Sequence, residues 1–142
     1  MSGLRPFHLA VPVHDLAQAR SFYGGLLACR EGRSSSHWVD FDLFGHQFVC
    51  HLDEGRQASG QIQNAVDGDS VPVPHFGVIL TMAGWESLRD RLVAARIRFV
   101  IEPRIRFQGE TGEQATMFFV DPSGNMLEFK AFGDDEQIFA HD

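Results

Sequence analysis

Hydrophobic residues recur along the first part of the chain with spacings that predict a strand, then a helix, then more strands. The first strand is expected over residues 6–13, and Asp15 can cap a helix that begins at Leu16. Apolar residues then recur at helical spacing up to Gly24 and Gly25. Three further strands are expected, over residues 30–34, 38–44 and 47–52. The predicted order of this first module is β-α-β-β-β.

The same order of elements recurs in the second half of the chain. A strand is expected over residues 74–81 and a helix over residues 84–95. One face of this helix carries four apolar residues, namely Trp85, Leu88, Leu92 and Ala95. The strands that complete the second module are expected over residues 98–102, 115–120 and 126–132. The repeat is supported by Gly45-His-Gln-Phe-Val, which stands where Gly124-Asn-Met-Leu-Glu stands in the second module.

Two such modules predict an α+β fold in a single domain over residues 1–142. Module one covers about residues 5–52 and module two about residues 74–132. A polar linker of about residues 53–73, which we expect to be mobile, joins them, and residues 133–142 form an acidic tail. Two half-open sheets bury their concave faces when they face each other, either as the two modules of one chain or as modules of two chains in a dimer. We therefore expect a half-open sheet cup around a cleft that can hold a ligand.

Glu128 stands out because it is a carboxylate among apolar neighbours on the last predicted strand. The turn formers Asp121-Pro-Ser-Gly-Asn precede this strand, and alternation then places Met126, Glu128 and Lys130 on one face. If that face lines a cavity, the carboxylate needs a partner, because an unpaired buried charge costs roughly several kcal/mol. A metal ion is one such partner. A Lys or Arg side chain, or water, is the alternative.

His8 and His75 occupy equivalent positions in the first strands of the two modules. Residues related by a pseudo-twofold repeat tend to approach each other near its axis, so both histidines are expected to face the cleft beside Glu128. Two imidazoles and one carboxylate form a facial triad that leaves about three coordination positions of a divalent ion open. This ligand set suits Fe(II) first and Mn(II) next. Taken singly, each histidine is also explained as a hydrogen-bonded residue of the core or its rim.

Four stretches of the sequence carry a family resemblance, namely FHLAVPVHDLAQARSFYGGLL, WVDFDLFGHQFVCHL, VPHFGVIL and GEQATMFFVDPSGNMLEFKAF. They resemble the vicinal oxygen chelate superfamily of glyoxalase I, bleomycin-resistance proteins and type I extradiol dioxygenases, and are nearest to small predicted members of the dioxygenase branch. The resemblance implies a metal site at His8, His75 and Glu128, whose separations of 67 and 53 residues resemble the dioxygenase arrangement. The usual fourth ligand of glyoxalase I falls at Val49, which cannot bind a metal.

The resemblance also implies a catalytic role for His51, which lies two residues beyond Val49 and should point to the same face. In the dioxygenase branch a histidine of that strand acts as acid and base near the bound substrate, and imidazole suits this task because it titrates near neutrality. A solvated strand residue is the alternative. One departure concerns the strand before Glu128, where the dioxygenases commonly have a tyrosine and this chain has Met117-Phe118-Phe119.

The predicted function is therefore that of a metal-dependent extradiol-type dioxygenase, acting with dioxygen on a small, aromatic substrate with vicinal oxygens. Two alternatives stay open. A glyoxalase-like lyase or isomerase would use the same triad with Zn(II), Ni(II) or Mn(II). A metal-free binding protein of the bleomycin-resistance type would need only an aromatic cleft. Arg104, Arg106 and Gln114 can orient a substrate carboxylate, or they form a solvated face around a loop.

Composition narrows the classes of partner. The formal net charge is −7, and no Lys/Arg cluster interrupts this acidity, so we expect no nucleic acid partner. No apolar stretch approaches the roughly 20 residues that span a bilayer, so no membrane partner is expected. Cys29 and Cys50 lack CxxC spacing, and no apolar signal run opens the chain, which favours a cytoplasmic protein with free thiols. A homodimer is also expected.

Overall fold

The computed structural model describes residues 3–58 and 71–141 and divides into two compact units. The first unit comprises residues 1–63 and 121–125, and the second comprises residues 64–120 and 126–142. Most of the predicted linker, residues 59–70, lies outside the described residues. Among the described residues, no helix is long and apolar enough to cross a membrane.

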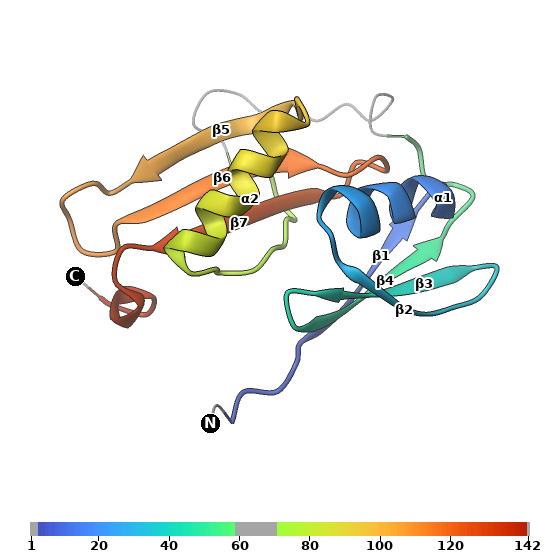
Figure 1. The fold of residues 1–142 in the computed structure, drawn as a ribbon, viewed down its shortest axis with the longest axis horizontal. Coiled ribbons are helices and arrows are strands. Elements are labelled where there is room, and N and C mark those ends of the chain that lie inside the picture. Colours follow the sequence, from blue (N-terminus) through green and yellow to red (C-terminus); the bar gives the residue numbers. More distant parts are fainter. Residues whose placement is uncertain (1–2, 59–70, 142) are drawn as a thin grey trace. The chain divides into compact units, whose positions relative to one another are not determined.

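The first unit is a four-stranded sheet with one helix (Figure 1). The chain forms these elements in the order β1 (His8–Val13), α1 (Leu16–Ala19), a π-helical continuation (Arg20–Leu26), β2 (Arg30–Ser34), β3 (Trp38–Leu43) and β4 (His46–Leu52). The strand order is β1-β4-β3-β2, in which β1 runs parallel to β4 and the other pairs are antiparallel. The Asp15 carboxylate accepts a hydrogen bond from Gln18 N at 3.0 Å, so the predicted cap is confirmed.

Helix and sheet of the first unit pack through aromatic residues. Tyr23 is fully buried, and its ring centroid lies 4.6 Å from that of Phe48 on β4 and 5.8 Å from that of Phe41 on β3. The helix widens after Ala19 into a π-helical segment where Gly24 and Gly25, poor helix formers, end the predicted helix. This widening was not predicted, because helical spacing of apolar residues alone does not distinguish the two kinds of turn.

The second unit is a three-stranded antiparallel sheet with a helix on one face (Figure 1). Its elements are α2 (Met82–Ala94), β5 (Phe99–Arg106), β6 (Gln114–Val120), β7 (Met126–Phe132) and a short 3-10 turn (Asp135–Gln137). Thr81 caps α2 by accepting from Gly84 N at 3.1 Å. The sheet order is β5-β6-β7. The acidic tail predicted for residues 133–142 therefore contains one helical turn.

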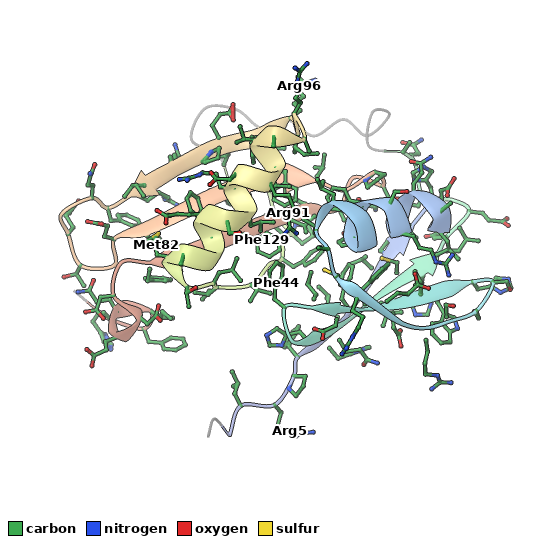
Figure 2. The ribbon with its side chains drawn as sticks, viewed as in Figure 1. Arg5, Phe44, Met82, Arg91, Arg96 and Phe129 are labelled. Atoms are coloured by element: carbon green, nitrogen blue, oxygen red, sulfur yellow. The ribbon has the colours of Figure 1, made fainter. Side chains whose placement is uncertain are left out.

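The buried face of α2 agrees with the sequence at three of its four predicted positions. Trp85, Leu88 and Leu92 are at most 4% exposed. Trp85 Nε1 donates to the carbonyl of Phe129 at 2.9 Å, and the buried Phe129 side chain lies on β7 beneath the helix (Figure 2). The prediction for Ala95 was wrong: it is the exposed C-cap, because the helix ends at Ala94 before the face can continue.

The strand predicted over residues 74–81 is not formed as a continuous strand. Only two isolated parallel bridges are present, Phe76 to Leu127 and Ile79 to Lys130. Between them the backbone of Gly77 approaches Glu128 so closely that a Cβ atom at Gly77 would lie 1.5 Å from the Glu128 carbonyl oxygen. Only glycine can therefore occupy this position without displacing the backbone of β7.

The register of these bridges nevertheless confirms the internal repeat. Phe76 pairs with Leu127 in the second unit, and Leu9 pairs with Phe48 in the first. The two pairs are related by the same offsets that relate His75 to His8 and Gly124 to Gly45. The protein is thus an α+β fold of two β-α-β-β-β-like modules, the first strand of the second being reduced to bridges.

We expect Gly77→Ala to destabilise the protein by about 2–3 kcal/mol, because the added methyl group must displace the backbone at Glu128. Urea unfolding followed by circular dichroism measures this loss. Gly25→Ala is the matched control, since a Cβ there meets nothing within 4 Å and replaces a poor helix former. Equal stability of the two variants would contradict the close packing at Gly77.

Candidate metal-binding site

Glu128 is held in the second unit by contacts to both carboxylate oxygens. Its side chain is almost buried, and Oε2 accepts a hydrogen bond from the Thr116 hydroxyl at 2.5 Å. Oε1 lies 3.1 Å from His75 Nε2. The structure therefore places His75 beside Glu128, as the repeat predicted, and it adds Thr116, a neighbour that the sequence did not indicate. Thr116 is found only from the register of β6 against β7, in which it lies two pairs away from Glu128 on the same face.

His75 is oriented by a backbone carbonyl. Its Nδ1 lies 2.6 Å from the oxygen of Pro72. A carbonyl oxygen only accepts, so Nδ1 must carry a proton and donate it. Nε2 of a neutral His75 then presents its lone pair to the Glu128 carboxylate. Two acceptors 3.1 Å apart need a proton or a metal ion between them. A proton on either atom makes the contact a hydrogen bond, and a metal ion would be bound by both side chains.

This arrangement fits a metal site because a metal-binding histidine normally donates its other nitrogen to a carbonyl or carboxylate. His75 has such a partner in Pro72, and Glu128 has one in Thr116. Nitrogen and oxygen donors of this kind suit divalent Fe, Mn, Zn and Ni. Within residues 3–58 and 71–141, however, no three His, Cys, Asp or Glu side chains are grouped so that they could hold a metal ion. The complete triad therefore stays a prediction.

His8, the third predicted ligand, lies in the first unit at the start of β1. It is exposed, and its Nδ1 lies 2.8 Å from Gln47 Oε1 on β4. With the amide oxygen as acceptor, His8 carries its proton on Nδ1 and keeps the Nε2 lone pair available. His8 and His75 therefore have the same tautomer. Gln47 was missed by the sequence analysis, and only the parallel pairing of β1 with β4, which sets His8 opposite Gln47, reveals it.

His51 is exposed near the end of β4, where it pairs with Pro12 and Trp38. Strand alternation places it on the same face as Gln47 and Val49, as predicted. The repeat relates His51 to Lys130 of β7, by the same offset that relates Gly45 to Gly124. Its proposed acid and base role stays a prediction.

Phe118 occupies the strand position that faces Glu128 across β6 and β7. It is 1% exposed, and its ring packs edge-on against His75 with 5.1 Å between ring centroids. A phenyl ring offers no hydroxyl group for a bound substrate. The phenylalanine that stands where the dioxygenases commonly have a tyrosine therefore lies directly beside the candidate ligands.

A second polar cluster surrounds the turn at residues 121–125 in the first unit. The buried Asp121 carboxylate accepts from the Tyr23 hydroxyl at 2.8 Å, from the backbone N–H groups of Ser123 and Asn125, and from the Asn125 side chain. Burial, and then the Asp121 charge, raise the pKa of Tyr23 well above its ordinary value. Ser123 in turn bonds the His14 ring at 2.7 Å. These contacts occupy both oxygens of the Asp121 carboxylate, so we assign this carboxylate to stability.

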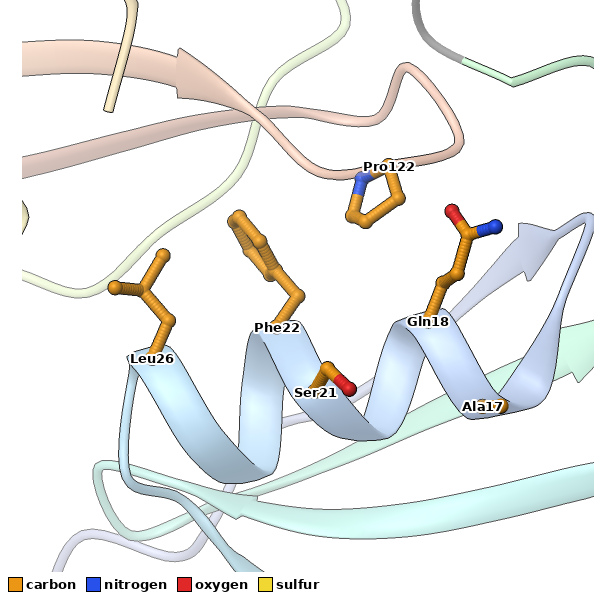
Figure 3. Close-up of a pocket in the computed structure, with 6 residues that line it drawn as sticks. All are labelled: Ala17, Gln18, Ser21, Phe22, Leu26 and Pro122. Carbon is orange, nitrogen blue, oxygen red and sulfur yellow. The ribbon is translucent and has the colours of Figure 1, made fainter. Parts of the chain in front are cut away.

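A shallow pocket of about 400 Å³ lies beside this turn (Figure 3). Its lining residues come from the helical segment and the turn, namely Ala17, Gln18, Ser21, Phe22, Leu26 and Pro122. Figure 3 shows the Phe22 and Leu26 side chains and the Pro122 ring turned towards it. None of its lining side chains titrates or ordinarily binds a metal, so this pocket is not the chemical site.

Comparisons with known proteins agree with this architecture. The profile of the Glyoxalase/Bleomycin resistance protein/Dioxygenase superfamily matches residues 5–129. A crystal structure of a glyoxalase/bleomycin resistance protein/dioxygenase from Alicyclobacillus acidocaldarius is 32% identical, with a TM-score of 0.79 over 94% of this chain and 96% of that one. Among curated proteins nothing matches.

Two more distant structures share the fold. A genomically encoded fosfomycin resistance protein, FosX, from Listeria monocytogenes is 19% identical, with a TM-score of 0.63 over 97% of this chain and 99% of that one. A glyoxalase/dioxygenase from Nostoc punctiforme is 17% identical, with a TM-score of 0.63 over 94% and 99%. At these identities the likeness extends to the fold alone.

Proposed function

The chain belongs to the glyoxalase/bleomycin resistance protein/dioxygenase superfamily, and from that premise we propose that it is a metal-dependent enzyme acting on a small molecule with vicinal oxygens. One observation carries the proposal. His75 Nε2 faces Glu128 Oε1 at 3.1 Å, while the other polar atom of each side chain is already bonded to Pro72 or Thr116. This geometry supports His75 and Glu128 as a preorganised pair of metal ligands, and His8, with the same tautomer, is the proposed third.

We favour extradiol-type oxygenation with Fe(II), and the proposed partners are an aromatic vicinal-oxygen substrate, dioxygen and a second copy of the chain. The bound ion supplies Lewis acidity and, as Fe(II), redox chemistry with dioxygen. Thr116 fixes the Glu128 carboxylate, so that Oε1 faces His75 Nε2 and would be available to hold the ion with it. His51 is proposed to take and return a substrate proton through its ring nitrogen, and Phe118 forms an apolar wall beside His75.

A lyase or isomerase with Mn(II), Zn(II) or Ni(II) is the second candidate, and Phe118 is the observation that favours it. A tyrosine hydroxyl at this position would bond a catecholate oxygen, and the phenyl ring cannot. A non-redox reaction on vicinal oxygens needs the metal and a base but no such hydroxyl. The two candidates share the same ligands and differ in their need for dioxygen.

Metal content and oxygen dependence distinguish these functions. We expect anaerobically purified protein to hold close to one iron per chain by elemental analysis and to consume oxygen when given 4-methylcatechol. Protein that instead holds zinc, nickel or manganese, and that converts the glutathione hemithioacetal of methylglyoxal without oxygen, would favour the lyase or isomerase over the oxygenase. Protein that takes up no divalent metal at all would contradict both and leave a binding protein.

A further inference from the structure

A row of cationic side chains shares the sheet face of Glu128 in the second unit. Directly paired residues of antiparallel strands project from the same face of a sheet. Thr116 pairs with Arg104 on one side and with Lys130 on the other, so all three lie side by side. Arg106 is aligned with Gln114 in the next row of the same face. The sequence predicted that this strand ends at residue 102, with both arginines around the following loop, whereas β5 extends to Arg106.

This row lies next to the candidate ligands. Thr116 donates to Glu128 Oε2, and successive residues on one face of a strand are about 7 Å apart. Lys130 follows Glu128 by two residues on β7, so the two residues lie on the same face of the sheet with their Cα atoms about 7 Å apart. A small molecule bound at His75 and Glu128 would therefore lie on the same face of the sheet as the cationic row.

Within residues 3–58 and 71–141, Arg104, Arg106 and Lys130 take part in no ion pair of 4.0 Å or less. The ion pairs there join Arg20 to Glu31, Arg30 to Asp42, Arg89 to Asp90 and His75 to Glu128. The Arg106 guanidinium instead lies 5.0 Å from the Phe107 ring centre, and the Lys130 ammonium 5.8 Å from that of Phe132. Aromatic rings hold these side chains in place without cancelling their charge. Both residues are partly buried, where an anionic partner strengthens binding most.

We propose that Arg104, Arg106 and Lys130 form an anion subsite, so that the substrate carries a carboxylate or phosphoryl group beside its vicinal oxygens. That the substrate carries vicinal oxygens rests on the proposed function. That these three residues bind an anionic group does not. The chain as a whole is acidic, with a net charge of −7, so this group of three cationic residues differs in sign from the overall charge. The guanidinium group of arginine donates two parallel hydrogen bonds to a carboxylate or phosphoryl group, and the lysine ammonium attracts the same groups as a compact positive charge.

The first test uses metal-free protein, so that it does not depend on the metal. Benzoate and phenylphosphonate are titrated by calorimetry against wild type and the Arg104→Met/Lys130→Met variant. We expect the double substitution to weaken binding at least about tenfold, and we expect benzyl alcohol to show no such change. The probe that binds wild type more tightly identifies the anion as carboxylate or phosphoryl. Arg91→Gln, on α2 at the other face of the sheet, is the matched control (Figure 2).

Lys130 offers an independent readout because it is the only lysine in the chain. Bound phenylphosphonate should slow its acetylation by acetic anhydride, measured by peptide mass spectrometry, whereas benzyl alcohol should not. In zinc-loaded protein, 3,4-dihydroxybenzoate should bind about tenfold more tightly than 4-methylcatechol, and the double variant should lose this preference. Equal anion binding by wild type and the double variant, or no anion binding by wild type, would overturn the subsite. Loss of both catechols with anion binding intact would instead count against the metal site alone.

Discussion

Glu128→Gln is expected to lower the affinity for Zn(II) or Mn(II) at least about 100-fold, which corresponds to about 2.7 kcal/mol. The substitution keeps the shape of the side chain and the partners around it, but it removes the only anionic ligand proposed for the site. Chelator competition followed by elemental analysis measures this affinity. Glu102→Gln is the matched control, because Glu102 is exposed on β5 and is not a proposed ligand.

Thr116→Val is expected to lower the metal affinity as well, but by less than Glu128→Gln does. Valine preserves the volume of the fully buried threonine but removes the hydroxyl that holds Glu128 Oε2. Loss of such a supporting hydrogen bond typically costs about 10-fold to 100-fold in metal affinity. Unchanged metal content in Glu128→Gln would exclude Glu128 as a ligand, and an unchanged affinity in Thr116→Val would limit Thr116 to a packing role.

Local chemistry explains which parts of the fold the sequence predicted. The start of the first helix and the whole of β7 were predicted from Asp15 and from the turn at residues 121–125, because capping and turn formation depend on neighbours in sequence. The strand at residues 74–81 failed for the opposite reason. Gly77 lies against the backbone of Glu128, which is far away along the chain, and this contact cannot be read from local spacing. The extension of β5 to Arg106 likewise depends on its pairing with β6.

The same distinction holds for the candidate site. The repeat was enough to bring His75 to Glu128, since equivalent strand positions are a property of the pattern. Thr116, Gln47 and the position of Lys130 beside Arg104 depend on which residues pair across strands. Alternation gives the face on which a side chain lies, but not its cross-strand neighbour. The polar surroundings of a predicted ligand are therefore what the structure adds.

Asp121→Ala is expected to destabilise the protein by about 3–5 kcal/mol, the largest loss of stability that we predict from a single side chain. The carboxylate is 1% exposed and accepts four hydrogen bonds, from Tyr23, Ser123 and, twice, Asn125. Alanine would leave the fully buried Tyr23 hydroxyl and the Ser123 N–H without this acceptor. Urea unfolding measures the loss, and Asp53→Ala, which removes one bond to Gly55 N in an exposed turn, should cost about 1 kcal/mol or less.

Tyr23→Phe separates the tyrosine from the rest of the Asp121 cluster through its pH dependence. The folded pKa of Tyr23 is raised by burial and by Asp121, so this residue contributes stability that is fully present below the ordinary pKa of 10.0 and is lost as pH rises above it. We expect wild type to lose stability above about pH 10 more steeply than Tyr23→Phe. Because Tyr23 is the only tyrosine, its ionisation is measured directly by ultraviolet absorbance and should coincide with unfolding. Tyrosinate formation in the folded protein near pH 10, or equal alkaline profiles for the two proteins, would show that the hydroxyl is not held by Asp121 in a buried site.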